Sequence, residues 1–402
     1  MRLLHTADWH LGKVLKGVAR LDEQRAVLDE MVEVAAREQV DAVLVAGDVF
    51  ESAAPAPDAQ ELAWATLLRL RALGIEVVVI AGNHDPAEAF QALRPVFHGA
   101  GVIVLGRAAR PGDGGVVELQ VGAARQPLRL ALLPFVTQRG VVKAEQLLEL
   151  DGAQMVQHYR DRLRQVLAAL TASFSADAVN VVAAHAMVTG GRLGGGERDA
   201  HTIFDYAVDA TAFPSSASYV ALGHLHRQQQ IPGPCPIWYP GSPVCIDFGE
   251  EANRPGVLVI DVAPGRPAQV RPVALTRARR LRTVTGTVAE LRELADGVGD
   301  DLLRVVVTEP ARAGMVDDVR AVLPNALDIR VAAPDPVTMS TSAVPAASRL
   351  GRSAVEQFAL FMAEQNVADP RIEALFAALL DTAASDGAGD RAGSGPTLPG
   401  RV

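Results

Sequence analysis

The chain has 402 residues, of which 49 % are hydrophobic and 21 % are charged, so we expect two to three globular domains and not a disordered chain. A net charge of −9 argues against a simple basic nucleic-acid-binding domain. It does not exclude a nucleic-acid enzyme, because bound divalent cations reverse the sign of a carboxylate-rich site. Two cysteines cannot form a disulfide framework, and neither a membrane span nor a signal peptide is evident, so we expect a cytoplasmic protein with no membrane attachment.

Residues 1–280 form the first predicted domain, in which short apolar runs alternate with helical stretches. The runs are rich in β-branched residues and bordered by Gly, Asn and Asp, which favours strands. Strands are expected at 2–5, 41–46, 75–81, 102–105, 128–133, 179–184, 219–222, 236–246 and 256–262, and helices at 20–39, 58–73, 86–98 and 144–172. Alternation of this kind, followed by consecutive strands, predicts an α/β domain with more than one sheet.

The remainder of the chain divides into four predicted parts. Residues 281–335 read strand–helix–strand–helix–strand, which predicts a small separate α/β module. Residues 336–350 resemble a Pro/Ser/Thr/Ala-rich linker, and 385–402 have the composition of a disordered tail. Residues 351–384 carry two amphipathic helices that are too short to form a core of their own. These helices either pack on the body or dock a partner.

Potential metal ligands and acid–base groups follow five of the predicted strands directly. They are Asp8, His10, Asp48, Asn83, His84, Asp85, His185, His224 and His226. Because the strand ends of α/β sheets are where ligands bind, we expect these side chains to meet. Asp8 and His10 alone could cap a turn, and His185 alone could be a structural histidine. Five strand ends that supply the same residue types together predict a metal site.

The number of candidate ligands suggests two ions. Four histidines, two aspartates and one asparagine are more groups than a single cation can use while leaving room for substrate. Two ions about 3.5–4 Å apart that share one carboxylate can use all of them. Mixed carboxylate, amide and imidazole ligands suit Mn, Fe or Zn more than Cu.

The order of these motifs resembles that of the calcineurin-like metallophosphoesterases. DWH at 8–10, GD at 47–48, GNHD at 82–85, a single histidine and GHLH at 223–226 carry the resemblance. It implies a two-sheet sandwich flanked by helices. The longer strings HTADWHLGK, GDVFE, AGNHD, GHLHR and YPGSP resemble the SbcD branch, the nuclease subunits of bacterial SbcCD complexes. In that branch a small capping module and C-terminal helices follow, as they do here.

The resemblance also implies a role for each residue. The ligands of one ion would be Asp8, His10 and His226. The ligands of the other would be Asn83, His185 and His224, with Asp48 as the bridge. His84 would be a catalytic histidine that binds no metal, and Asp85 the carboxylate that orients it. The cofactors would be two divalent cations, most commonly Mn²⁺ in this family.

The function implied is that of a DNA endo- and exonuclease in DNA-end processing and double-strand-break repair. It would contact the DNA backbone and work with the coiled-coil ATPase SbcC, which residues 351–384 would bind. A homodimer would form through the helices at 58–73 and 86–98, whose apolar residues include Trp64, Leu67, Leu68, Phe90, Leu93 and Phe97. One alternative is a stand-alone phosphodiesterase or nucleotidase, which would not need the residues after 280. The other is a non-catalytic scaffold, which would not need His84.

Three further features are not explained by the motifs. Glu51 stands where some relatives have a histidine that helps to position DNA, which puts that single detail in doubt. The glycine-rich stretch 190–196 lacks the Lys-Ser/Thr of a P-loop and is interpreted as a flexible surface loop. The arginines of 277–282 form a basic run that is either a solvated junction or a contact with the DNA backbone.

Overall fold

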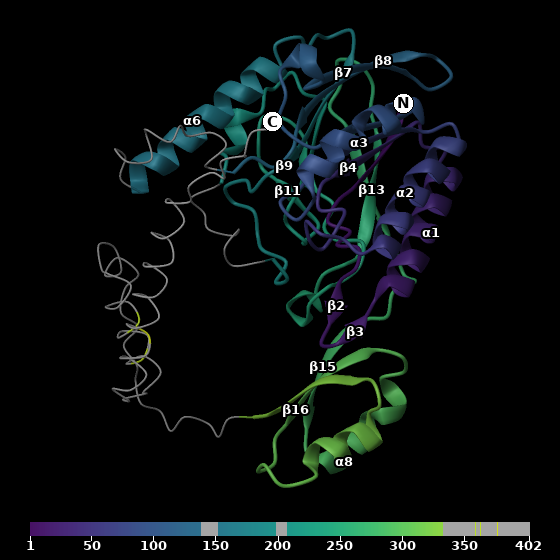
Figure 1. Cartoon of the computed structure of the whole chain (residues 1–402), viewed down its shortest axis with the longest axis vertical. Helices are drawn as coiled ribbons and strands as arrows, with labels where there is room; N and C mark the ends of the chain where they lie inside the picture. The colour runs from purple at the N-terminus through teal and green to yellow at the C-terminus, as the bar shows by residue number, and fades with distance from the viewer. Residues whose placement is uncertain (138–151, 198–206, 333–357, 359–361, 363–375, 377–402) are drawn as a thin grey trace, which may run out of the picture. The chain divides into compact units, whose positions relative to one another are not determined.

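The structure is a computed structural model that describes residues 1–137, 152–197, 207–332, 358, 362 and 376. It divides into two units, Met1–Ala332 and Ala333–Val402 (Figure 1). The predicted linker and tail, most of the C-terminal helices and residues 144–151 of a predicted helix lie outside the described residues. Within the second unit the rings of Phe358 and Phe376, one from each predicted helix, stack with centroids 3.9 Å apart.

Two six-stranded sheets form the body of the first unit. The first sheet has the order β14 (Gln269–Ala274), β13 (Gly256–Asp261), β1 (Arg2–Thr6), β4 (Ala42–Ala46), β5 (Glu76–Ile80), β6 (Val102–Leu105). The second has the order β11 (Gln229–Ile231), β12 (Ile237–Tyr239), β10 (Tyr219–Gly223), β9 (Val179–His185), β8 (Gln126–Leu133), β7 (Val116–Val121). Strands β1, β4, β5 and β6 are parallel, as are β8, β9, β10 and β12.

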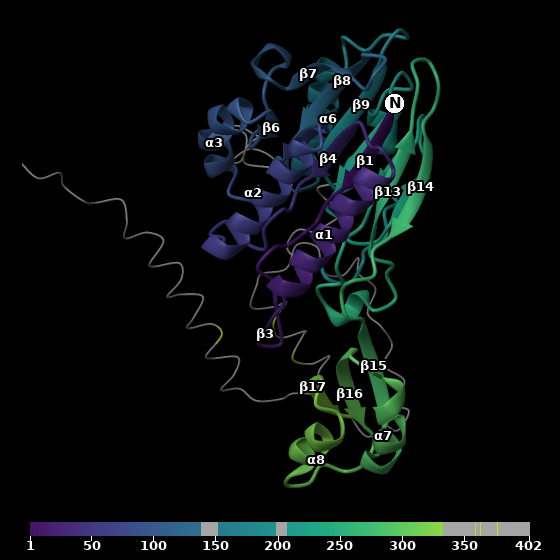
Figure 2. The same cartoon turned by 90° about the vertical axis from the view of Figure 1, so that its right-hand side faces the viewer.

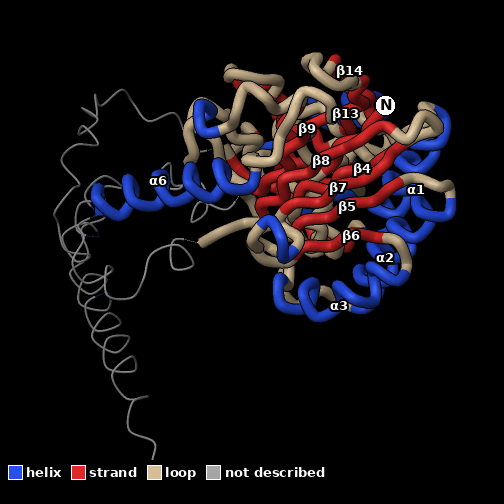
Figure 3. The backbone as a smooth tube through the Cα atoms, turned by 90° about the horizontal axis from the view of Figure 1, so that it is seen from above, coloured by secondary structure: helices blue, strands red, loops and turns tan. Residues whose placement is uncertain are grey.

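Helices cover the outer face of each sheet (Figures 2 and 3). The first sheet is covered by α1 (Leu21–Arg37), α2 (Pro57–Ala72) and α3 (Ala87–Gly99). The second is covered by α6 (Gly152–Leu170), which packs through Tyr159, Leu163 and Leu167. The predicted two-sheet sandwich flanked by helices is therefore confirmed.

The central strands are buried on both faces, which explains their continuous apolar sequence. In β4, Val43 and Val45 point into the core beneath the helices, while Ala42 and Leu44 point into the core between the sheets. The period-2 alternation of side chains thus connects one strand to two cores. The edge strands β14 and β7 lack this signature. Their side chains are exposed or half-buried with the single exception of Val121, so neither strand was recognised in the sequence.

The strand predicted at 236–246 is wrong beyond its first part. Only β12 (Ile237–Tyr239) is extended in the sheet. Gly241 has φ of +73°, a conformation that glycine adopts without strain. There the chain turns back, and the Ser242 amide donates to the His226 carbonyl at 3.2 Å. The apolar residues Val244 and Ile246 are buried in a loop and not in a strand.

A small three-stranded parallel sheet follows the body (Figure 1). Its elements are β15 (Leu281–Gly286), α7 (Val288–Leu294), β16 (Leu302–Val307), α8 (Met315–Val322) and β17 (Ala326–Val331). We call residues 281–331 the small module. It is seated on the short helix η5 (Phe248–Glu250): Phe248 packs with Leu281 and Leu302, and the Arg304 guanidinium lies 4.6 Å from the centre of its ring.

The basic run between body and module is held by ion pairs. Arg277 pairs with Glu33, and Arg279 donates through Nε and Nη2 to Glu23, so both reach acids of helix α1. Arg282 lies 3.9 Å from Asp301 of the module. These pairs favour the structural junction over a DNA-backbone contact.

Of the apolar residues expected at a dimer surface, some are buried within the chain and others are exposed. Leu67, Phe90 and Phe97 are buried in their own chain, so for these three the expectation of free surface is wrong. The indole of Trp64 joins them, with its ring centre 5.7 Å from that of Phe90. Leu68 is 44 % exposed and Val96, on α3, is 67 % exposed. Outward-facing apolar surface on α2 and α3 is thus confined to fewer residues than the sequence suggested.

Arg20 connects the start of helix α1 with two segments that come later in the chain, at Cys245 and at Arg279. Its buried guanidinium pairs with Glu23 and donates to the backbone carbonyls of Cys245 and Arg279. We expect Arg20→Ala to lower the free energy of unfolding by about 3–5 kcal/mol, because it leaves buried acceptors unpaired. Denaturant unfolding measures this. Arg277→Ala, which removes an exposed ion pair from the same helix, should have no measurable effect; equal effects would contradict the role given to Arg20.

Candidate metal centre

The carboxyl ends of strands from both sheets meet at one place. The register pairs Ala46 of β4 with Ile80 of β5 in the first sheet, and His185 of β9 with Gly223 of β10 in the second. The two sheets are joined here because the His185 ring Nδ1 lies 2.8 Å from the Ala46 carbonyl. Loops that leave these strands therefore start within a few ångströms of one another.

Glycines allow this approach. A Cβ at Gly47 would overlap the His185 ring nitrogen Nδ1, and a Cβ at Gly82 would overlap the Asp48 carboxylate. A Cβ at Gly223 would overlap the Ala46 carbonyl. The glycines that precede Asp48 and His224 are thus a steric requirement of strand ends from two sheets that approach each other, and the glycine that precedes Asn83 is required by the neighbouring loop of the same sheet.

Four of the polar residues have positive φ, which non-glycine residues rarely adopt. Asp8, His10 and Asp48 have φ of +55°, +47° and +51°, and His224 has φ of +111°. Backbone hydrogen bonds hold the first two there: the Asp8 amide donates to Gly47 at 2.9 Å and the His10 amide to Asp48 at 3.1 Å. Strained residues that the surrounding structure fixes in this way are typical of functional sites.

The seven predicted ligands all come together. Side-chain atoms within 4.8 Å of one another form three groups, which are Asp8, His10 and His226; His10, Asp48 and His84; and Asp48, His185 and His224. The remaining ligand, Asn83, places its Oδ1 2.9 Å from both His185 Nε2 and His224 Nδ1. Asp48 and His10 each belong to two of these groups, and Asp48 is the one of the pair that is a carboxylate, as a bridge between two ions requires.

The His10 and His226 rings show that these donors fit a cation. Their Nε2 atoms face each other at 3.0 Å. The Nδ1 of His10 lies 3.0 Å from Glu51 Oε2, and that of His226 lies 2.6 Å from Glu250 Oε1. An ionised carboxylate only accepts hydrogen bonds, so each Nδ1 carries a hydrogen and each Nε2 of a neutral ring presents a lone pair. Two lone pairs directed at one point need a proton or a metal ion between them.

The pKa values of the groups in this cluster are shifted in opposite directions. Burial raises the pKa of Asp8 to about 7 and lowers that of His10 to about 4. Burial alone would lower the pKa of His226, but Glu250, Asp8 and Glu197 outweigh it and raise that pKa to about 9. Asp48 acts in the same way on His185, whose pKa rises to about 9. Protonated imidazoles therefore balance buried carboxylates, and a cation that binds here displaces protons.

The expected contact between Asp85 and His84 is wrong. The His84 ring Nδ1 lies 2.8 Å from the Glu51 backbone carbonyl, which orients the ring. The Asp85 carboxylate instead accepts from the Phe50 amide at 2.9 Å and the Gly82 amide at 2.8 Å. Asp85 therefore fixes the loop that presents His84, because its side chain turns back toward the backbone amides of two loops.

The glycine-rich stretch 190–196 is a surface loop, as expected, with Gly190, Arg192, Leu193 and Gly195 exposed, but part of it packs against the site. A Cβ at Gly194 would crowd His226, and a Cβ at Gly196 would overlap Glu250. Glu197 closes the loop by accepting from the Gly194 amide at 2.6 Å and the His226 amide at 3.0 Å. These glycines are required for close packing and not for mobility.

Four supporting residues were missed in the sequence, namely Gln24, Phe135, Glu197 and Glu250. Gln24, buried on α1, donates to the His10 carbonyl at 2.7 Å and accepts from Gly12 at 3.0 Å. Phe135 stacks on His224, with ring centres 6.2 Å apart and planes inclined by 18°. No local pattern distinguishes them, because each acts on a residue far away in the chain.

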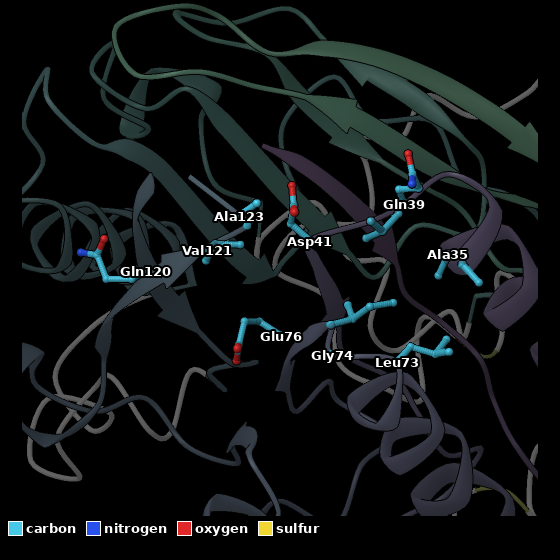
Figure 4. Close-up of a pocket in the computed structure, with 13 residues that line it drawn as sticks. Ala35, Gln39, Asp41, Leu73, Gly74, Glu76, Gln120, Val121 and Ala123 are labelled. Atoms are coloured by element: carbon cyan, nitrogen blue, oxygen red, sulfur yellow. The ribbon is translucent and has the colours of Figure 1, made fainter. Parts of the chain in front are cut away.

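A cavity of about 580 Å³ lies away from these ligands (Figure 4). It is lined by Gln39, Asp41, Glu76 and Gln120 among others, at the opposite ends of β4 and β5. Its carboxylates are engaged: Asp41 accepts from the Arg2 amide at 2.7 Å, and Glu76 pairs with Arg71 at 3.0 Å. The chemistry of this chain is therefore concentrated at the other end of the strands.

Comparison with known proteins agrees with the geometry of the site. Residues 1–228 match the calcineurin-like phosphoesterase family. The chain belongs to this family. As a calcineurin-like phosphoesterase it is a metal-dependent hydrolase, and the described clusters supply the donors for divalent cations.

Individual relatives are named as nucleases. The phosphoesterase is 35 % identical to the SbcD component of the nuclease SbcCD of Bacillus subtilis over 285 residues, which cover 70 % of this chain and 71 % of the relative. It is 36 % identical to the protein of the same name from Rhodobacter capsulatus over 363 residues, 86 % of this chain and 84 % of the relative. A dimetal phosphatase structure from Danio rerio has a TM-score of 0.43 and 13 % identity, and the match covers 69 % of this chain and 96 % of that chain. Among the described residues, no helix is both long and apolar enough to cross a membrane.

Gly47→Ala tests whether the packing of the two sheets forms this phosphoesterase site. Gly74 is the matched control, since both glycines have positive φ, at +94° and +80°, but a Cβ at Gly74 meets no atom within 4 Å. Gly74→Ala should cost about 1–2 kcal/mol of backbone strain. Gly47→Ala should cost about 1–3 kcal/mol more and displace His185, which weakens divalent-cation binding. Unfolding and calorimetric metal titration measure both; equal losses in the two variants would contradict the argument.

Proposed function

We propose that this chain is a cytoplasmic, manganese-dependent DNA nuclease that hydrolyses phosphodiester bonds during DNA-end processing and double-strand-break repair. The observation that carries the proposal is the convergence of seven candidate ligands in adjoining clusters, two of which share Asp48, with His84 beside them. Relatives named as components of the nuclease SbcCD, matched over most of their length, support DNA as the substrate.

The roles follow the clusters. Asp8, His10 and His226 would hold one ion. Asn83, His185 and His224 would hold the other, with Asp48 as the shared ligand. When bound, such a pair of divalent cations neutralises charge on phosphate oxygens and lowers the pKa of water. The carboxylate, amide and imidazole donors of this chain suit Mn²⁺.

His84 is the residue we assign to proton transfer. Its Nδ1 donates to the Glu51 carbonyl, so proton transfer to a leaving oxygen falls to Nε2 of the same ring. The ring is buried among the ligands, with its centre 4.8 Å from that of His10, and is therefore held in one orientation. Asp85 keeps this loop in place through the Gly82 and Phe50 amides.

The substrate class is tested by comparing linear duplex DNA with bis-p-nitrophenyl phosphate, both with Mn²⁺ and with or without the ATPase SbcC. We expect cleavage of both, and ATP-dependent stimulation for DNA only. Cleavage restricted to the small ester would favour a stand-alone phosphodiesterase. No cleavage of either would favour a scaffold that does not catalyse. The small module, seated on η5 of the body, is a feature that a stand-alone phosphodiesterase does not need.

His84→Ala should reduce turnover by roughly 10²–10⁴-fold, the usual contribution of one acid–base group, while both ions still bind. The physical reason is that His84 is surplus to the two ligand sets. Calorimetric titration with Mn²⁺ checks the second half: loss of one ion would make His84 a ligand. Asp48→Ala is the contrasting variant and should lose both ions, since it removes the bridge.

The C-terminal helices are proposed to bind SbcC. They lie largely outside the described residues, but the stacked rings of Phe358 and Phe376 are consistent with two helices that pair through apolar faces. Truncation after Ala346 should preserve Mn²⁺-dependent cleavage of single-stranded DNA and abolish both SbcC binding and ATP-stimulated duplex cleavage. Co-elution of the truncated chain with SbcC would place the contact elsewhere, and loss of the basal cleavage would assign the helices to the catalytic body.

A homodimer through α2 and α3 is proposed on the apolar surface that remains there. Leu68 and Val96 are 44 % and 67 % exposed, which is high for large apolar side chains. Val96→Glu should therefore shift the chain from dimer to monomer in sedimentation at micromolar concentration, because it places a charge in the contact. Val316→Glu, at a residue of the small module that is 43 % exposed, is the control and should not shift it. A wild-type monomer under these conditions would contradict the proposal.

A further inference from the structure

His10 and His226 at one proposed cation position differ from His185 at the other in what lies behind their rings. At the Asp8 position both ligating rings turn Nδ1 to a carboxylate, Glu51 behind His10 at 3.0 Å and Glu250 behind His226 at 2.6 Å. At the other position the Nδ1 of His185 faces a neutral acceptor, the Ala46 carbonyl, at 2.8 Å. The motifs treat these histidines alike, and only the structure separates them.

Glu250 is built into the fold as a fixed carboxylate. It is fully buried, and its Oε2 accepts from the Ile246 amide at 2.7 Å while Oε1 faces His226. The turn that carries it is closed by Asp247, which accepts from the Gly249 amide at 2.8 Å. A Cβ at residue 196 would overlap this carboxylate, so the glycine there makes room for it. A buried carboxylate is costly unless it is paired, so this position is explained by the imidazole that it serves.

Glu51 serves His10 from a more open position. Its side chain is 22 % exposed, and its two oxygens are divided between His10 Nδ1 at 3.0 Å and Lys13 Nζ at 3.1 Å. The residue that stands where some relatives have a histidine therefore has a defined task in this chain. It fixes the His10 ring from behind, on the side away from His226.

A carboxylate behind a ligating imidazole has two effects. It fixes the tautomer, so that Nε2 always presents its lone pair, and it raises the electron density at that nitrogen. Loss of such a partner typically costs 10–100-fold in metal affinity. A neutral carbonyl gives the first effect but supplies no negative charge. With two carboxylates behind two rings, the Asp8 position attracts a cation more strongly.

We propose that Glu51 and Glu250 are positioning residues that make the Asp8–His10–His226 position the tighter of the two cation positions. The inference rests on the proposed dinuclear centre and adds an order of loading: this position fills first, and the position of Asn83, His185 and His224 fills at higher metal concentration.

Calorimetric titration of the purified full-length chain with Mn²⁺ tests this order. The wild type should bind two ions in separate steps. His185→Ala should lose the weaker step and keep the tighter one. Glu250→Gln should weaken the tighter step by roughly 10–100-fold and leave the weaker step in place. Glu251→Gln is the matched control, since Glu251 lies on the same turn but accepts from Thr283 of the small module at 2.7 Å. It should change neither step.

Glu51→Gln keeps the test decisive if Glu250→Gln does not fold, because the Glu51 side chain is partly exposed. It too should weaken the tighter step by roughly 10-fold or more, whereas Lys13→Met, which removes only the other partner of Glu51, should not. A wild type that binds no Mn²⁺ would contradict the proposed metal centre itself. A wild type with two steps, in which both glutamine variants titrate as the wild type does or His185→Ala loses the tighter step, would overturn the order of loading alone.

Discussion

The site depends on one constraint, which is that the carboxyl ends of strands from two different sheets share a volume too small for side chains in their connecting loops. Gly47 and Gly223 satisfy it, since a Cβ at either would overlap His185 or Ala46 of the other sheet, and Gly82 meets the same need beside Asp48 within the first sheet. The close approach lets the His185 ring reach the Ala46 carbonyl across the sheets. It also lets the Asp8 carboxylate accept from the His224 amide at 3.0 Å. Ligands from residue 8 to residue 226 thereby occupy one buried cluster.

Burial of so many ionisable groups must be balanced locally. Carboxylates and imidazoles alternate through the cluster, and the pKa values of Asp8 and His10 move in the directions that disfavour isolated charges. Around them, backbone groups and outer carboxylates fix each ring: the Glu51 carbonyl for His84, the Glu51 carboxylate for His10, and Glu250 for His226. Glu51 therefore contacts two functional histidines with different atoms. The loop after β4 therefore orients two histidines of the site in addition to supplying Asp48.

Side-chain contacts also connect the site with the rest of the fold. Helix η5 carries Glu250 toward His226 and Phe248 toward the small module, so one short element borders both. Arg20 and the pairs of Arg277 and Arg279 with helix α1 fasten the segment that leads into that module. The basic run thus has a structural explanation.

The sequence by itself determined the central strands, the helices of the body and the candidate ligands, because buried parallel strands are continuous apolar runs and their ends hold the polar residues. The arrangement as a two-sheet sandwich came from the family resemblance of those motifs. The edge strands β14 and β7 were missed because most of their side chains are exposed or only half-buried. The tertiary structure alone decided that Asp85 holds a loop and not a ring, that Gly194 and Gly196 pack closely, and that Glu250 stands behind His226. Each of these features depends on a neighbouring residue from another loop or strand. Periodicity along the chain indicates which side of a helix or strand is buried, but not which residues of other elements will contact that side.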